Sequence, residues 1–222
     1  MGQLYLVRHG QASLGADDYD QLSPLGAQQS QRLGEHWRAQ GLQFDAVITG
    51  TLKRHAQTLH GIQQGLGSSH EPLLWPGLNE YDSEAVIRTI QKGPLTKPTT
   101  PEGYREHFRL LRDGLTQWMA GVVSPQGMPS YVDFVQGVSS ALDHVRQNHD
   151  GNVLLVSSGG PIATAVAQVL QLSPETSIEL NLRIRNSAVS EFSFNPKRHS
   201  LISFNTITHL ESPTHKGWIT YA

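Results

Sequence analysis

The chain has 222 residues, of which 37% are hydrophobic and 16% are charged, and this size and composition predict a single globular domain over 1–222. It contains no cysteine, which excludes disulfides, catalytic thiolates and zinc sites built from cysteine. Its 17 basic and 19 acidic residues give a formal net charge of -2, which argues against nucleic acid and membrane surfaces as partners.

The first predicted element is a short apolar strand close to the N-terminus. It covers residues 4–7 and leads directly into Arg8, His9 and Gly10. A polar loop is expected to follow over 16–21. Because the strand begins so early and no apolar run approaches the roughly 18 residues of a membrane helix, we expect a cytoplasmic protein.

Helix and strand alternate in the next part of the chain. Ser23 followed by Pro24 is typical of a helix N-terminus, and Gly41 is the expected stop of a helix that reaches about residue 40. A second strand is predicted over 45–49 and a second helix over about 52–65. This alternation indicates an α/β fold with parallel strands.

A helical insert, or cap, is predicted over 82–149. Prolines separate its three helix-like stretches, which are 83–92, 101–119 and 131–148. Sheet character then returns at 152–157, an apolar helix follows to about 172, and 188–194 and 201–207 are expected to pair as antiparallel strands. The predicted fold is therefore three-layer α/β: a mostly parallel sheet with helices on both faces, an antiparallel strand near the C-terminus and a helical insert over the site.

The side chains with the clearest chemical roles follow the first two predicted strands. Arg8 offers a planar fork of donors for phosphate or carboxylate oxygens, and a neutral imidazole at His9 can act as nucleophile or base. Arg54 lies on the first turn of a helix, where backbone N–H groups also attract anions. Because parallel strands bring their carboxyl ends to one edge of the sheet, we expect these groups to meet there.

Two later segments add to the same edge. Glu80 lies between Leu78 and Tyr81, and an apolar environment favours a raised pKa and a general-acid role for its carboxyl group. Ser158 and Gly159 follow a predicted strand and open a helix, where small residues let the backbone approach a bound group. Together the segments predict an anion pocket with a histidine at its centre.

Taken in order, these segments resemble the histidine phosphatase superfamily, which also contains the cofactor-dependent phosphoglycerate mutases. The resemblance covers nearly the whole chain, and the ordered set is far more specific than any one of its pieces. It rests on Arg8-His9-Gly10, Ser23-Pro24-Leu25-Gly26, Leu52-Lys53-Arg54 with Gln57-Thr58, Glu80, Asn186-Ser187 and Thr208-His209-Leu210.

The resemblance implies a role for each matched residue. His9 resembles the nucleophile that accepts a phosphoryl group, Arg8 and Arg54 resemble the clamp on its oxygens, and Glu80 resembles the proton donor to the leaving group. These roles imply a phosphatase that hydrolyses a small phosphorylated substrate through a phosphohistidine, without a cofactor or a metal ion. The oligomeric state is left open.

Some positions depart from the family pattern. Gln11 and Ser13 lie on the loop after the nucleophile, where family members often contact phosphate, but the asparagine commonly found there is absent. The family usually has a second histidine where this chain has Ser158, and serine can donate only a neutral hydrogen bond. Another histidine could fill this space, and His55 is the nearest candidate in sequence. Because Arg54 is expected to face the pocket, we favour a position for His55 on the helix surface or in the core.

Two alternatives remain beside the phosphatase. A phosphoglycerate mutase has the same fold, but the loop after Gly10 and the insert after Glu80 do not look like the mutase versions, which carry additional basic residues. The second alternative is a catalytically weakened protein that only binds a phosphorylated ligand, because Ser158 replaces a charged donor. Retention of Glu80 argues against this second alternative, since a site that only binds has no need of an acid facing the leaving group.

Overall fold

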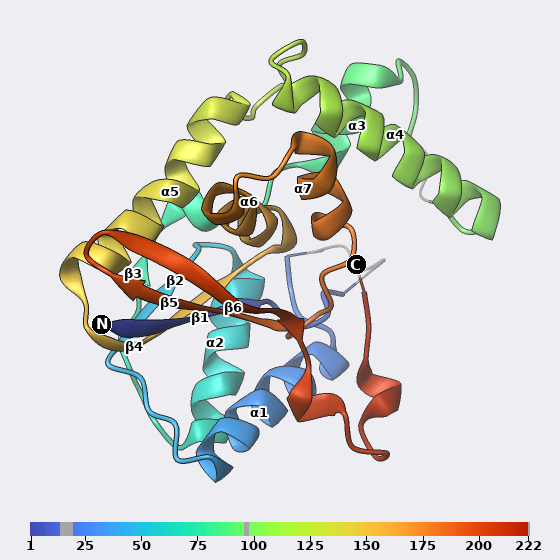
Figure 1. Cartoon of the computed structure of the whole chain (residues 1–222). Helices are drawn as coiled ribbons and strands as arrows, with labels where there is room; N and C mark the ends of the chain where they lie inside the picture. The colour runs from blue at the N-terminus through green and yellow to red at the C-terminus, as the bar shows by residue number, and fades with distance from the viewer. Residues whose placement is uncertain (14–19, 96–97, 222) are drawn as a thin grey trace.

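The computed structural model describes residues 1–13, 20–95 and 98–221, so residues 16–19 of the predicted polar loop lie outside the described part of the chain. A 6-stranded sheet has the order β3-β2-β4-β1-β5-β6 (Figure 1). The strands are β1 (Gly2–Arg8), β2 (Ala46–Thr49), β3 (Leu73–Leu74), β4 (Gly151–Ser157), β5 (Val189–Asn195) and β6 (Arg198–Thr206). Strands β1 to β4 pair in parallel, whereas β5 is antiparallel to β1 and to β6. The predicted three-layer α/β fold is confirmed.

The helices agree with the predicted stretches except near the end of the chain. They are α1 (Pro24–Ala39), α2 (Lys53–Leu66), α3 (Ser83–Ile90), α4 (Pro101–Met119), α5 (Tyr131–Asn148), α6 (Gly159–Leu170) and α7 (Pro174–Asn181), with 3-10 turns η1 (Pro76–Leu78), η2 (Thr208–Leu210) and η3 (Lys216–Trp218). Strand β3 and helix α7 were not predicted. A two-residue strand shows no periodicity, but α7 had a signal, because Ser173 and Pro174 repeat the Ser23–Pro24 start of α1.

The two faces of the sheet carry separate cores because side chains alternate along each strand. On β1, Leu4 and Leu6 belong to the core beneath α5 and α6, whereas Val7 belongs to the core beneath α1 and α2. The same division is visible in Figure 1, where α1 and α2 lie on one side of the sheet and α5 and α6 on the other. The polar residues Arg8, Thr49 and Ser157 end β1, β2 and β4 at the carboxyl edge of the sheet.

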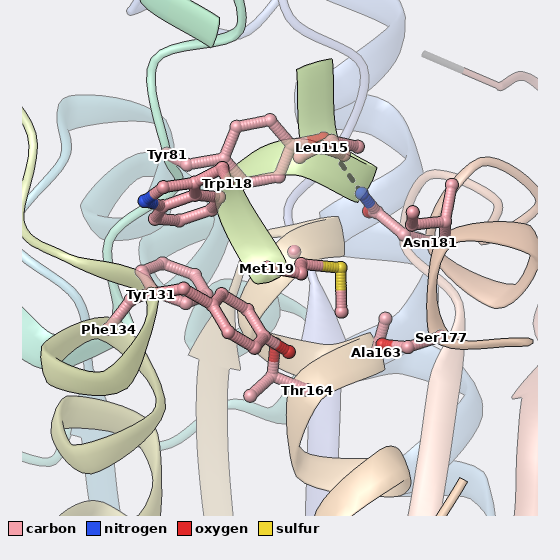
Figure 2. Close-up of a pocket in the computed structure, with 12 residues that line it drawn as sticks. Tyr81, Leu115, Trp118, Met119, Tyr131, Phe134, Ala163, Thr164, Ser177 and Asn181 are labelled. Carbon is pink, nitrogen blue, oxygen red and sulfur yellow. Dashed lines mark hydrogen bonds between the residues drawn. The ribbon is translucent and has the colours of Figure 1, made fainter. Parts of the chain in front are cut away.

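An aromatic cluster joins α4 and α5 of the insert to Tyr81, which precedes α3. Trp118 on α4 is 2% exposed, and its ring centroid lies 5.9 Å from that of Tyr81 and 5.3 Å from that of Phe134 on α5. Figure 2 shows these rings together with Asn181, whose Nδ2 donates to the Tyr81 hydroxyl at 2.8 Å. Because Tyr81 directly follows Glu80, this cluster fixes the segment that carries the predicted acid.

None of the helices in the described residues is long and apolar enough to cross a membrane.

The buried His209 predicts a loss of stability in acid. Burial, with smaller contributions from His36, Arg32 and His215, lowers the pKa of His209 to about 3. Above pH ~6.5 the ring is neutral in both folded and unfolded chains; as the pH falls below that value, only the unfolded chain takes up the proton. The free energy of unfolding therefore decreases towards pH 3, by at most about 1.4 kcal/mol per pH unit for this one group.

The contribution of His209 is isolated by urea unfolding of wild type and His209→Gln between pH 8 and pH 4. Its Nε2 lies 2.8 Å from Ser187 Oγ, and a glutamine amide can keep that hydrogen bond without titrating. We expect a shallower decline of the unfolding free energy in His209→Gln. His60→Gln, at an exposed position of α2, is the control and should follow wild type. Parallel slopes for all three proteins would contradict the prediction.

Candidate active site

The ends of β1 and β4 place the first residues of the site. Arg8 and Ser157 are paired in the parallel register, so that His9 and Ser158 leave the sheet side by side. The His9 N–H continues the ladder by donating to the Ser157 carbonyl at 2.9 Å, and the Arg8 N–H donates to Ala188 O at 3.0 Å. The backbone on both sides therefore fixes where the His9 side chain begins.

The contacts of His9 define which ring nitrogen is available for reaction. Its Nδ1 lies 2.7 Å from the carbonyl oxygen of Gly10, and its Nε2 accepts from Nε of Arg54 at 3.3 Å. A carbonyl only accepts and a guanidinium only donates, so the proton is on Nδ1 and the lone pair is on Nε2. Neutral His9 thus presents Nε2 as its nucleophilic atom, towards Arg54.

Two arginines give the site its positive charge. Arg8 is 5% exposed and is held by a hydrogen bond from Nη1 to the Ile184 carbonyl, while Arg54, on the first turn of α2, is 7% exposed. Burial lowers the pKa of His9 well below its ordinary value, and the positive charges of Arg8 and Arg54 lower it further. His9 is therefore neutral, with its lone pair available, throughout the neutral pH range.

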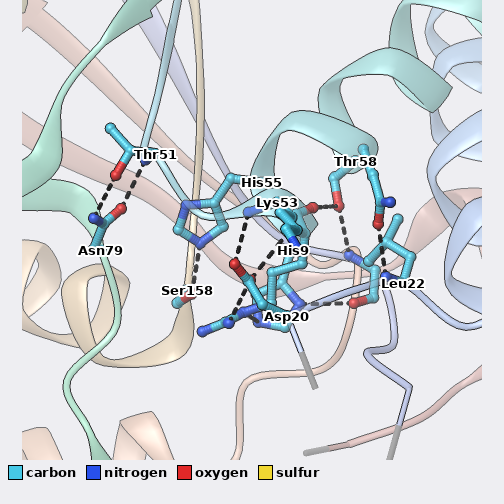
Figure 3. Close-up of polar contacts among 12 residues, drawn as sticks. His9, Asp20, Leu22, Thr51, Lys53, His55, Thr58, Asn79 and Ser158 are labelled. Carbon is cyan, nitrogen blue, oxygen red and sulfur yellow. Dashed lines mark hydrogen bonds and ion pairs between the residues drawn. The ribbon is translucent and has the colours of Figure 1, made fainter. Parts of the chain in front are cut away.

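Asp20 interacts with the start of α2, and sequence reasoning missed it. Its carboxylate accepts from the Lys53 N–H at 2.9 Å and from Nη1 of Arg54 at 2.9 Å (Figure 3). It lies more than thirty residues before α2 in the chain, so no local capping pattern could reveal it. Because Asp20 occupies these helix N–H groups, an anion at this edge meets the arginine side chains rather than the helix terminus.

Glu80 approaches the site from the loop between η1 and α3. The N–H of Gly160 donates to its two carboxylate oxygens at 3.1 and 3.2 Å, and a Cβ at position 160 would lie 2.2 Å from Oε1. The carboxylate occupies the space that a side chain at this position would take, so its present place beside the Gly160 N–H depends on the glycine. Burial raises the pKa of Glu80, while the Gly160 N–H and the charges of Arg54 and Arg8 offset part of that rise.

Ser158 and Gly159 lie where the sequence predicted, at the junction of β4 and α6, but their neighbour was not predicted. Oγ of Ser158 is 2.7 Å from Nε2 of His55, and both side chains are fully buried. The His55 ring centroid is 5.9 Å from that of His9. His55 is therefore buried, as a core position would have it, and it also contacts the site, as the less favoured alternative allowed. From the first turn of α2, Arg54 contacts His9 and His55 contacts Ser158.

The described hydrogen bonds of Gln11 and Ser13 connect neither residue to the cluster around His9. Oε1 of Gln11 accepts from Ser23 Oγ at 2.8 Å, at the N-cap of α1. Ser13 is half-buried, and its N–H donates to Gln21 O at 2.8 Å. Both residues lie on the loop that follows His9, whose residues 14–19 are outside the described part.

Comparisons with known proteins bear on the family and the fold of the chain. A family model described as histidine phosphatase superfamily (branch 1) matches residues 4–207. A protein of Hydrogenobacter thermophilus named as a candidate phosphoserine phosphatase is 23% identical over 96% of this chain and 100% of its own length. A phosphoserine phosphatase variant from Entamoeba histolytica, crystallised with phosphoserine, has a TM-score of 0.65 at 22% identity, covering 95% of this chain and 100% of its own. A phosphoglycerate mutase from Bacillus anthracis has a TM-score of 0.66 at 18% identity, with 94% of each chain covered.

Proposed function

The chain belongs to the histidine phosphatase superfamily (branch 1), and from this membership and the site we propose that it hydrolyses a small phosphomonoester through a phosphohistidine on His9. The observation that carries the proposal is the state of His9. A neutral ring with its proton on Nδ1 presents the Nε2 lone pair among two arginines and a partly buried carboxyl group. Nucleophile, charge compensation and acid are the three parts that phosphoryl transfer requires.

In the first step, His9 Nε2 forms a bond to phosphorus while the bond from phosphorus to the ester oxygen breaks. Arg8 and Arg54 take the equatorial oxygens, and Arg54 exchanges its contact with Nε2 for one with the phosphoryl group. Glu80 gives its proton to the departing oxygen. The Nδ1–H bond to Gly10 O persists, and it stabilises the positive charge that the ring acquires.

In the second step, water replaces histidine on phosphorus. Glu80, now a carboxylate, accepts a proton from the attacking water, and the bond between Nε2 and phosphorus breaks to release phosphate and neutral His9. The side chain of Glu80 is thereby returned to its acid form. The proposed phosphoryl contacts beyond the arginines are Ser158 and Gly159 at the start of α6, with Gln11 and Ser13 on the loop after His9.

The insert supports a phosphatase over a phosphoglycerate mutase. A mutase must also hold the second anionic group of its substrate, which calls for further basic side chains near the site. The described arginines of α3 and α4 instead pair with acids at exposed positions: Arg88 with Glu84, Arg105 with Glu102, Arg109 with Glu106 and Asp113, and Arg112 with Glu179. We therefore expect no interconversion of 2- and 3-phosphoglycerate at enzymatic rates.

Hydrolysis of an aryl phosphate in the presence of a chelator tests this function. Because two buried arginines offset the phosphoryl charge, we expect turnover that is unchanged by the chelator. Activity that disappears with the chelator and returns with a divalent cation would contradict the proposed mechanism. Tight binding of inorganic phosphate without turnover of any phosphomonoester would instead favour the weakened, ligand-binding protein.

A further inference from the structure

His55 is a buried titratable group that the proposed mechanism does not use. Its side chain lies on the first turn of α2 and is 0% exposed, and burial together with Arg54 lowers its pKa to about 3. The ring rests on Gly50 at the end of β2, where a Cβ would lie only 2.3 Å from Nδ1. The backbone thus makes room for an imidazole at the edge where β1, β2 and β4 end.

Ser158 is the N-cap residue of α6, yet its hydroxyl does not cap the helix. A serine at this position ordinarily accepts a hydrogen bond from a backbone N–H of the first turn. Here the Gly160 N–H donates to Glu80, and Ser158 Oγ lies 2.7 Å from His55 Nε2 instead. The local preference has been replaced by a bond to a residue more than one hundred positions away.

The surroundings of the two His55 ring nitrogens determine which partner donates in the hydrogen bond between His55 and Ser158. Nδ1 is buried and has no partner among the described residues. If the neutral ring carried its proton on Nδ1, a buried N–H donor would be left unsatisfied, which is the costlier arrangement. The proton is therefore placed on Nε2, which donates to Ser158 Oγ. The hydroxyl proton of Ser158 then remains available for another acceptor.

Ser158 lies where that acceptor would be a phosphoryl oxygen. The residue before it is paired with Arg8, and the Ser157 carbonyl accepts from the His9 N–H. The residue after it is Gly159, where a Cβ would lie 3.7 Å from Glu80 Oε2. The backbone of Ser158 thus joins a residue bonded to the proposed nucleophile to a residue that adjoins the proposed acid.

We propose that Ser158 donates a hydrogen bond to the transferring phosphoryl group and that His55 is the positioning residue that aims this donor through Nε2–H. The inference rests on the proposed function and deepens the description of that site. A serine hydroxyl without a hydrogen-bond partner can rotate freely. A hydroxyl that already accepts from Nε2–H instead points its own proton away from the imidazole. A preorganised donor of this kind strengthens as charge develops in the transition state, so its effect is expected in kcat more than in KM.

Glutamine and asparagine at position 55 form a matched pair for the test. A glutamine amide nitrogen reaches about as far as Nε2 of histidine, whereas that of asparagine reaches only as far as Nδ1. We expect His55→Gln to retain kcat within about fivefold, while His55→Asn and Ser158→Ala each lose about 10- to 1,000-fold in kcat with smaller changes in KM. The double variant that combines His55→Asn with Ser158→Ala should have a kcat no lower than that of Ser158→Ala alone, because the two residues act as one unit.

Three outcomes overturn the proposal: equal kcat in His55→Gln and His55→Asn, wild-type kcat in Ser158→Ala, or additive losses in the double variant. Ser158→Ala removes a single oxygen atom and keeps the test decisive where the asparagine variant fails to fold. Spectra of the ¹⁵N-labelled protein provide a readout without turnover, because they show which His55 nitrogen carries the proton. A proton on Nδ1 contradicts the proposal, whereas turnover that survives in His9→Ala contradicts the proposed function itself.

Discussion

Substitution of His9 by alanine should lower the turnover of an aryl phosphate by at least about 10⁴-fold, because we expect no second residue to form the covalent intermediate. The described structure supports this exclusivity. The ring of His55 lies 5.9 Å from that of His9, but its Nε2 is engaged by Ser158 and its Nδ1 lies against Gly50. The measurement is kcat for wild type and His9→Ala under identical conditions.

Binding separates a chemical effect of this substitution from a structural one. Arg8 and Arg54 are anchored by Ile184 and Asp20 and not by His9 alone, so His9→Ala should still bind inorganic phosphate. His60→Ala, at an exposed position of the same helix, serves as the control and should keep wild-type kcat. Turnover by His9→Ala within tenfold of wild type would rule out His9 as the nucleophile.

Substitution of Glu80 by glutamine should produce a loss that depends on the leaving group. An alkyl alcohol needs a proton as it departs, and removing a general acid costs about 10²- to 10⁴-fold. An activated aryl leaving group departs without one, so its first step should be affected much less. We therefore expect Glu80→Gln to lower kcat/KM steeply for an alkyl phosphate and only slightly for a nitrophenyl phosphate.

The pH profile provides the second part of this test. Burial raises the pKa of Glu80, and only its protonated form can donate, so kcat/KM for the alkyl phosphate should fall as the pH rises through that pKa. In Glu80→Gln this fall should vanish, since the amide does not titrate. Glu84→Gln, which alters an exposed acid of the insert, should leave the profile unchanged. An equal loss for both substrates would indicate that Glu80 has no acid role.

The sequence was sufficient to place the residues that follow strands. Arg8, His9, Ser158 and Arg54 all lie at the ends of β1, β4 and β2, because parallel strands bring their carboxyl ends to one edge whatever the details of packing. Glu80 was harder to place. Its contact with the Gly160 N–H depends on the absence of a side chain eighty positions later, and sequence alone supplies no such distance.

Asp20 and His55 show why the remainder of the site could not be predicted. Asp20 caps α2 across thirty-three positions, and its neighbours in sequence carry no capping pattern that points to that helix. For His55, the argument that Arg54 takes the pocket-facing direction assumed that one side chain at the helix start faces the site. Residues one apart on a helix differ in direction by only about 100°, and an edge formed by two strand ends is wide enough for both.

The most direct test of the account is to look for phosphate on His9. Wild-type protein is mixed with a phosphomonoester, quenched in alkali within milliseconds to preserve an acid-labile phosphoramidate, and digested for mass spectrometry. The account predicts a phosphorylated peptide that contains His9, that is lost in His9→Ala, and that forms and decays at rates compatible with kcat. Steady turnover with no phosphorylated His9 at any time point would contradict the phosphohistidine mechanism, and with it the role assigned to the centre of the site.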